Sequence, residues 1–307
     1  MHFRFAAALT SVIALVGLAA EPVFAAINQV ATYATVAGGI FGLAFDAGGN
    51  LYATVAANVW KIGPGGSPTT LFVTGMTNTK GIAVDAGGNL YVADWGDNAS
   101  IPAKIWKVTP AGVKSVFATV ASPAGLAFDG SGNLLVSQWG VHNVAKVTPA
   151  GVVSNYATGI SGPTDQVGQL FYDATTGDLY AACETTIKKI GAGGSPVTTA
   201  VSGLVGCQYG MTRDADGSFY LGRFSHRDVY YVSPSGSASL YAGAHLAQAC
   251  VDGPLLDARF ALPAFEVIHG NTLYIADSDC HTVRTIDLQG ITASARSSWG
   301  RLKTLYR

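Results

Sequence analysis

The chain has 307 residues and a formal net charge of −1, with 18 Lys and Arg residues against 19 Asp and Glu residues. Only 12% of its residues are charged, compared with about 25% in a typical soluble protein. A chain with so little charge of either sign lacks the electrostatic means to attract nucleic acid or an anionic membrane, so we expect neither as a partner.

The first predicted element is a secretory signal peptide over residues 1–25. A basic start precedes an apolar run that ends near Ala20, and Val23-Phe-Ala25 provides a small-residue cleavage pattern. The alternative is a retained membrane anchor, but the apolar run is shorter than the roughly 20 residues that a spanning helix needs. The sequence therefore predicts an exported protein, secreted or periplasmic, with no stable membrane insertion after cleavage.

One unit recurs six times over residues 26–296, and each copy joins two apolar strand patterns through a turn rich in Gly and Asn. The first strands begin near Phe41, Lys80, Ala124, Gly168, Tyr209 and Ala264. The first five copies recur at intervals of 39 to 44 residues, which is the length of one four-stranded propeller blade. The sequence therefore predicts an all-β fold, a six-bladed β-propeller of four-stranded antiparallel blades in one domain.

The N-terminal segment is predicted to close the ring. Residues 30–36 resemble the outer strand of other repeats, such as residues 113–119, but they precede the first repeat. We expect this segment to supply the outer strand of blade six, with residues 291–295 as a competing candidate. The basic ending, residues 297–307, matches no part of the repeat, and its role stays open.

The antiparallel strand order divides the connections between the two faces of the disc. The connections between first and second strands and between third and fourth strands are short and share one face. The remaining connections vary in length and carry the unusual side chains. We call their side of the disc the variable face, and we expect function there because a rigid scaffold displays its loops.

Four cysteines lie in the second half of the chain, where export would permit disulfides. They are Cys183, Cys207, Cys250 and Cys280. Four cysteines allow three pairings, and their places in neighbouring connections favour Cys183 with Cys207 and Cys250 with Cys280. The alternative of a reactive thiol pair lacks a Cys-x-x-Cys motif.

These repeats resemble those of NHL-repeat propellers. The final unit matches best, with Asp252-Gly-Pro254, Leu273-Tyr-Ile-Ala-Asp277 and His281-Thr-Val-Arg-Thr-Ile-Asp287 in the family's usual order. The resemblance implies a propeller fold and binding modules, sensors or a zinc-dependent amidating lyase among its functions, and more distantly gluconolactonases and strictosidine synthases. The Glu-Gly-Pro motif that supplies a metal-binding Glu in gluconolactonases is replaced here by Gly39-Ile-Phe-Gly42.

Three histidines of the variable face are candidate zinc ligands, because they occupy nearly equivalent places before the third strand of their repeats. They are His142, His226 and His281. Three imidazoles that converge on the axis would bind zinc and leave one position for water. The alternative is that the repeat places His there for reasons of local structure.

Acidic residues in the same connections are candidate general bases or calcium ligands. They are Asp94, Asp97, Glu184, Asp277 and Asp279. Loop capping is the alternative for Asp94 and Asp277. Glu184 is less routine, because it stands where other repeats have Thr54, Asp94 or Gln138, and we expect it to border the channel mouth.

Two further groups on the variable face are candidate ligand-binding residues. Arg223 and Arg227 form a cationic patch that would bind a carboxylate, with a solvated loop as the alternative. Trp95 and Trp139 occupy comparable connections, and packing between blades is the alternative for them. With the amides of Asn98 and Gln138 nearby, these aromatic faces would bind a sugar or a peptide.

Two functions fit this pattern. The favoured one is a secreted module that binds a protein, small molecule or carbohydrate, because the sequence contains no nucleophile elbow, zincin helix or phosphate-binding loop. The alternative is an exported metal-dependent hydrolase or lyase, using zinc or calcium, with Glu184, His226 and Arg223 as candidate catalytic residues. A purely structural role in the cell envelope is a third hypothesis.

Overall fold

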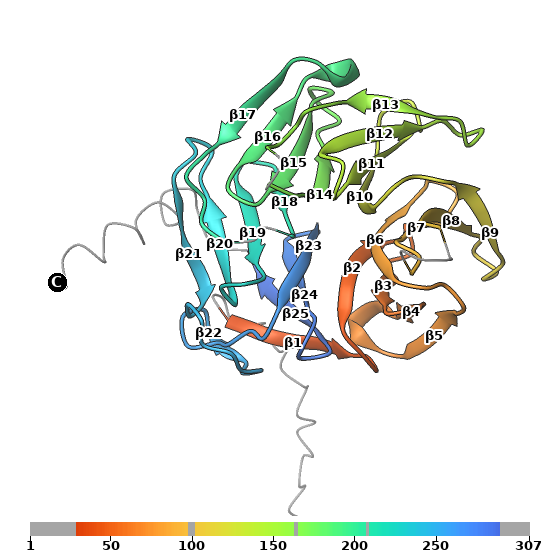
Figure 1. Cartoon of the computed structure of the whole chain (residues 1–307). Coiled ribbons are helices and arrows are strands. Elements are labelled where there is room, and N and C mark those ends of the chain that lie inside the picture. The colour runs from red at the N-terminus through yellow and green to blue at the C-terminus, as the bar shows by residue number, and fades with distance from the viewer. Residues whose placement is uncertain (1–28, 98–101, 163–164, 207–208, 289–307) are drawn as a thin grey trace, which may run out of the picture.

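The computed structural model describes residues 29–97, 102–162, 165–206 and 209–288. Their strands form six antiparallel sheets arranged in a ring around one axis (Figure 1). The predicted signal peptide, Asn98, Cys207, residues 291–295 and the basic ending lie outside the described residues. No helix within the described ranges is long and apolar enough to cross a membrane.

Each of the first five blades is built from four strands that follow one another in sequence. Blade one contains β2 (Ile40–Phe45), β3 (Leu51–Val55), β4 (Asn58–Ile62) and β5 (Thr69–Val73). Blade two contains β6 (Thr79–Val84), β7 (Leu90–Asp94), β8 (Lys104–Val108) and β9 (Lys114–Ala118). Blade three contains β10 (Pro123–Phe128), β11 (Leu134–Gln138), β12 (Asn143–Val147) and β13 (Val153–Ala157).

The next two blades repeat this order. Blade four contains β14 (Val167–Tyr172), β15 (Leu179–Cys183), β16 (Ile187–Ile190) and β17 (Val197–Val201). Blade five contains β18 (Thr212–Arg213), β19 (Phe219–Arg223), β20 (Asp228–Val232) and β21 (Ala238–Gly243). Short 3₁₀ turns, η1 (Pro64–Gly66) and η2 (Ala192–Gly194), precede the outer strands of blades one and four. The predicted all-β propeller with six antiparallel blades is confirmed.

Blade six joins the two ends of the described chain. Its order is β22-β1-β25-β24-β23, in which β1 (Gln29–Thr35) pairs antiparallel with β25 (Thr282–Asp287). The remaining strands are β22 (Gly253–Pro254), β23 (Pro263–His269) and β24 (Thr272–Asp277). The N-terminal strand therefore closes the ring as predicted, and β22 adds a short fifth strand outside it.

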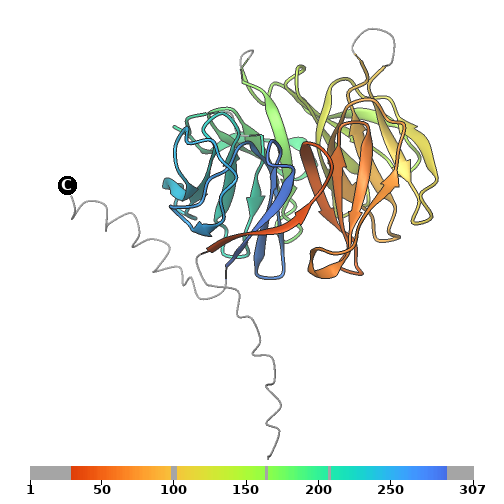
Figure 2. The same cartoon turned by 90° about the horizontal axis from the view of Figure 1, so that it is seen from below.

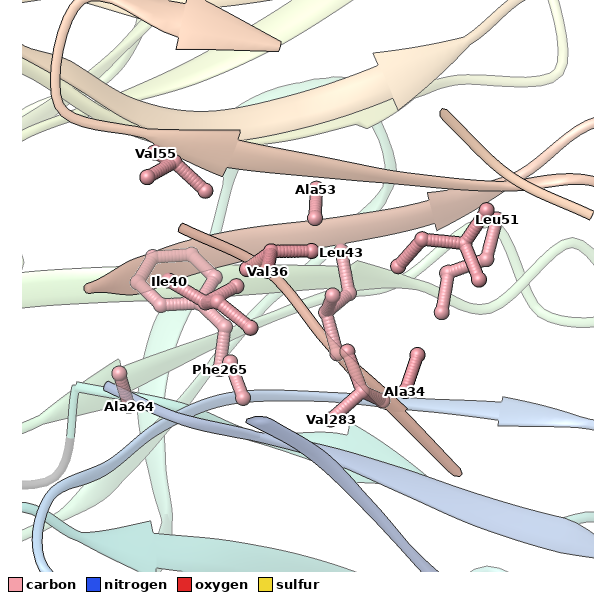
Figure 3. Packing of buried hydrophobic residues seen from close by; sticks show 12 residues of the cluster. Ala34, Val36, Ile40, Leu43, Leu51, Ala53, Val55, Ala264, Phe265 and Val283 are labelled. Atoms are coloured by element: carbon pink, nitrogen blue, oxygen red, sulfur yellow. The ribbon is translucent and has the colours of Figure 1, made fainter. Parts of the chain in front are cut away.

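The second strands of the first five blades are the most deeply buried elements of the core. Every residue of β3, β7, β11, β15 and β19 is buried, because these strands are covered on both faces by neighbouring blades. Such strands read as continuous apolar runs rather than as an alternation of apolar and polar residues. In Figure 3, Ile40 and Leu43 of blade one pack with Phe265 and Val283 of blade six. Figure 2 shows the ring from its edge, with the strands crossing the thickness of the disc.

The structure supports one of the two predicted disulfides. Cys250 and Cys280 are bonded, which ties the segment before blade six to the connection between β24 and β25. Cys183 is a free thiol, so its predicted pairing with Cys207 is wrong. The reason is that Cys183 ends a central strand and its side chain is fully buried among the apolar residues between blades. Burial raises the pKa of this thiol to about 12.

An aromatic cavity at the channel mouth

A cavity of about 160 Å³ opens on the variable face, at the centre of the ring. It is lined by Phe41, Lys80, Trp95, Ala124, Trp139, Tyr209, Phe224 and Phe265. Six of these eight residues are aromatic, and Lys80 is the single lining residue with a charged side chain. We call these eight residues the aromatic cavity.

Seven of the eight lining residues come from two equivalent positions of the repeat, and Phe265 lies one residue beyond the first of them, at the position of Gly42. Leu43, Ile82 and Leu126 pair with the middle residues of their second strands, so Phe41, Lys80 and Ala124 lie at one shared register position. Tyr209 occupies the same position in blade five, given the pairing of Thr212 with Tyr220. The other position directly follows the second strand, and it is filled by Trp95, Trp139 and Phe224.

A shift in strand register turns the first of these positions toward the axis. In blades one and two the pairing of inner and second strands slips between Ile40 and Leu43 and between Thr79 and Ile82. Backbone groups released by the slip are bound by a hydroxyl, since Thr54 Oγ1 accepts from Gly42 N at 2.7 Å and donates to Lys80 O at 2.6 Å. The backbone of Lys80 is therefore held by the neighbouring blade.

Gln169 links the inner strands of neighbouring blades through its side chain. It lies at the register position that Gly42, Gly81 and Gly125 occupy in blades one to three. Its side-chain oxygen accepts from Met211 N at 2.9 Å and from Glu266 N at 3.2 Å, and its amide nitrogen donates to Glu266 O at 2.7 Å. Gln169 thus joins blade four to blades five and six and stabilises the contact between their inner strands.

Replacing Gln169 with Leu is expected to lower the free energy of unfolding by about 2 kcal/mol, because three backbone groups lose their partner. The matched control is Gln138→Leu, which removes a single bond, from the Gln138 amide to Ala121 O at 3.2 Å. Chemical denaturation of both variants checks the prediction, and equal losses for the two would contradict the bridging role of Gln169.

The aromatic rings form an arc to which blade four contributes no ring. Trp139 and Tyr209 stack at a centroid distance of 4.4 Å with an interplanar angle of 4°, although they belong to blades three and five. Tyr209 also contacts Phe224 at 4.6 Å, and Trp95 lies 6.1 Å from Trp139. Blade four has Gly168 at the first lining position, and a residue without a side chain there leaves room for the stack.

Lys80 completes the arc between blades one and two. Its Nζ lies 3.9 Å from the ring centroid of Phe41 and 4.6 Å from that of Trp95. Cation–π contacts of this kind stabilise the ammonium form, but burial dominates and lowers the pKa of Lys80 to about 8. Within the described ranges, no carboxylate forms an ion pair with Lys80 and none lines the cavity.

Solved structures share this fold at low sequence identity. An auxiliary nutrient binding protein from Bacteroides thetaiotaomicron matches with a TM-score of 0.71 and 13% identity, over 84% of this chain and 75% of that chain. Virginiamycin B lyase from Staphylococcus aureus matches at 0.60 and 14%, over 85% and 98%. A gluconolactonase from Xanthomonas campestris matches at 0.64 and 14%, over 84% and 89%.

The likeness is one of fold. No protein-family model matches the chain, and no curated protein matches it. Nutrient-binding proteins, a lyase and a gluconolactonase share the propeller. The fold alone therefore does not determine function, which depends on the residues of the site.

The three candidate zinc ligands do not converge. His142 lies beside Ser161 and the carbonyl oxygen of Asp165, whereas His226 contacts His245 in a tilted arrangement with ring centroids 4.6 Å apart. Burial and the nearby positive charge of Arg223 lower the pKa of His226. The described residues contain no group of three His, Cys, Asp or Glu side chains that could hold a metal ion.

Local backbone geometry explains the repeated histidine. His142, Arg227 and His281 each directly precede the third strand and have positive φ values of 58°, 63° and 56°. Histidine is among the residues that adopt this left-handed conformation more readily than most. His281 is exposed, and His226 lies one residue before the shared position, so it is not equivalent to the other two.

Two of the five acidic candidates, Asp94 and Asp277, cap loops. Asp94 accepts from the amides of Asn78 and Gly96 at 2.8 and 3.1 Å and from the Trp106 indole at 2.9 Å. Burial acts to raise the pKa of Asp94, but these hydrogen bonds outweigh it and lower the pKa. Asp277 accepts from the amides of Ala261 and Leu262. Asp97 and Asp279 are exposed.

Glu184 occupies a different position from the one predicted. Cys183 pairs with Val167 as Asp94 pairs with Thr79, so Glu184 corresponds to Trp95 and not to Asp94. Its backbone amide donates to the side chain of Asp165. Glu184 follows the second strand of blade four, the blade that contributes no ring to the aromatic arc. It is not among the residues that line the cavity.

The two candidate arginines are engaged in structural contacts. Arg223 is 4% exposed and binds Asp228 through two hydrogen bonds of 2.6 Å. Arg227 donates to the carbonyl oxygen of Ala261 at 2.7 Å. Trp95 and Trp139 do line the cavity, while Gln138 bonds to a loop carbonyl and lies outside the lining.

Proposed function

We propose that the chain is an exported protein that binds a small planar molecule in the aromatic cavity. The main observation behind this proposal is the lining of the cavity. Six aromatic side chains from five blades line it together with one lysine, which has no carboxylate partner among the described residues. Aromatic walls with one well-placed polar group are typical of ligand sites. The nutrient-binding proteins that share the fold support a binding role, and the Cys250–Cys280 disulfide supports export.

The size and charge of the cavity define the class of ligand. A cavity of about 150 Å³ accepts benzene in another protein, so about 160 Å³ accommodates a single ring. The Lys80 ammonium repels cationic ligands and attracts an oxygen atom of a carboxylate, phenol or carbonyl group. We infer a single-ring ligand that places its flat face on Trp95 or Trp139 and an oxygen atom near Lys80.

Single-ring aromatic acids are expected to bind to the wild type and to bind roughly tenfold or more weakly to Lys80→Met, because a charge-assisted hydrogen bond is lost. Quenching of tryptophan fluorescence reports binding, since Trp95 and Trp139 line the cavity. 4-Hydroxybenzoate is the first probe, and calorimetry gives its affinity.

The control for this experiment is Lys61→Met, because Lys61 lies over the Tyr52 ring outside the cavity. This variant is expected to bind as the wild type does. Equal affinities for Lys80→Met and the wild type, or no saturable binding by any acid of a single-ring series, would refute the proposal.

A further inference from the structure

The environment of Lys80 is suited to covalent chemistry as well as to ion pairing. Two aromatic rings surround its amine at 3.9 and 4.6 Å, and the described residues provide no counter-ion for it. Burial of this amine in the cavity wall favours its unprotonated form, which is how proteins prepare a lysine for attack on a carbonyl group. By contrast, a hydrogen bond with Tyr91 raises the pKa of Lys107, and one with Asp178 raises the pKa of Lys189.

The backbone on both sides of this lysine is fixed. Thr54 of blade one holds the carbonyl oxygen of Lys80, and the next residue but one, Ile82, resumes the strand pairing. The side chain therefore starts from a defined point on the cavity wall. A bound ring resting on Trp95 or Trp139 would present its substituent to this amine.

We propose that Lys80 forms an imine with the carbonyl group of a small aromatic aldehyde or ketone. This inference rests on the proposed function, and it assigns a chemical class to the ligand. The lone pair of unprotonated Nζ attacks the carbonyl carbon and forms a C–N bond, while the carbonyl π electrons move to oxygen, which takes up one of the two amine protons. The hydroxyl then leaves as water with the second amine proton, the nitrogen lone pair forms the C=N bond, and no oxidation state changes.

The cavity lining favours imine formation over hydrolysis of the bound compound. Tyr209 and Lys80 are the ionisable side chains among the lining residues, and no carboxylate or imidazole is present in the lining to activate water. The imine nitrogen would remain between aromatic rings, where water is scarce. The site would therefore retain a carbonyl compound reversibly rather than convert it.

The test uses 4-hydroxybenzaldehyde with sodium cyanoborohydride, which reduces an imine to a stable secondary amine. Intact-mass measurement is expected to show one hydroxybenzyl group per chain, and peptide mapping is expected to place it on Lys80. At pH 7 a lysine with a pKa of about 8 has roughly 300-fold more free amine than one at 10.5. Labelling of Lys80 should exceed that of Lys61 by roughly tenfold or more.

Two variants separate the outcomes. Lys80→Arg keeps the charge and the contacts with the rings, so it is expected to retain 4-hydroxybenzoate binding and to lose the specific label. Labelling spread evenly over the lysines, or an unchanged label in Lys80→Arg, would overturn the imine while leaving the binding site intact. Failure of the wild type to bind both the acid and the aldehyde would instead overturn the proposed function.

Discussion

The Glu266→Gln variant is expected to gain stability relative to the wild type as the pH rises from 5 to 8.5, by about 3–5 kcal/mol. Glu266 lies on the inner strand of blade six and is fully buried. It takes the register position that Leu43, Ile82 and Leu126 occupy in blades one to three. A carboxyl group therefore stands where the repeat otherwise places an apolar side chain.

Two glycines create the space for this carboxyl group. A Cβ at Gly210 would lie 2.0 Å from Glu266 Oε2, and a Cβ at Gly222 would lie 1.9 Å from Oε1. Neither oxygen completes a hydrogen bond within the described structure. Burial raises the pKa of Glu266 to about 8, and the nearby Gly222 amide offsets only part of that effect. The folded protein therefore holds the neutral acid.

The direction of the pH dependence follows from proton uptake. Between the unfolded pKa of 4.5 and the folded pKa of about 8, the folded state keeps a proton that the unfolded state releases. Stability is therefore full below pH 4.5 and falls until about pH 8. The amide of Gln cannot ionise, so the variant lacks this loss.

Chemical denaturation at pH 5, 7 and 8.5 measures the effect. The control is Met211→Leu, at the corresponding position of blade five, which is also fully buried and does not ionise. Its difference from the wild type is expected to be the same at every pH. A constant difference for Glu266→Gln would show that the carboxyl group is not held neutral.

Replacing Arg284 with Met is expected to lower the free energy of unfolding by about 3–5 kcal/mol, because it leaves a buried carboxylate without its partner. Arg284 is 1% exposed, and it contacts Asp277, which is fully buried, at 3.2 Å. It also binds Asp252 at 2.5 Å and the carbonyl oxygen of Val251 at 2.8 Å. Asp252 in turn accepts from the backbone amide of Thr32 on β1.

The size of this effect depends on burial and on position in the ring. The same arginine joins the β24 strand end, the segment before blade six and the closing strand β1. The control is Arg213→Met, which removes a more exposed ion pair with Asp173 and is expected to cost about 1 kcal/mol or less. Adding Asp277→Asn to Arg284→Met should recover part of the loss, and a loss as small as that of Arg213→Met would contradict the prediction.

The periodic sequence was sufficient to predict the architecture. Apolar strand patterns and Gly turns recur at a length that fits one blade, and the unmatched copy of an outer strand before the first repeat identified β1 as the closing strand. These features are local and repeated, so each of the six copies supports the assignment of strands in the others. The pairing of Cys183 was wrong because strand ends in adjacent blades can turn their side chains into the core.

The lining of the aromatic cavity was predicted only in part, since its residues are marked by departures from the repeat. Trp95 and Trp139 were singled out because tryptophan in a loop is conspicuous. Lys80 was interpreted only as the start of a repeat. The same position holds Phe41 in blade one and Tyr209 in blade five, and this variation between repeats was the signal that could have identified Lys80 as a cavity residue. Glu266 likewise interrupts an apolar strand. Phe41 and Lys80 lie within a slip in strand pairing that the sequence does not display.

Closure of blade six by β1 has a consequence for folding. The first described strand can complete its sheet only when β25 is present, so the circle shuts only after the strands of all six blades are available. The aromatic cavity draws residues from blades one, two, three, five and six, and a truncated chain would lack part of its wall. A complete cavity wall is therefore available only in the assembled ring.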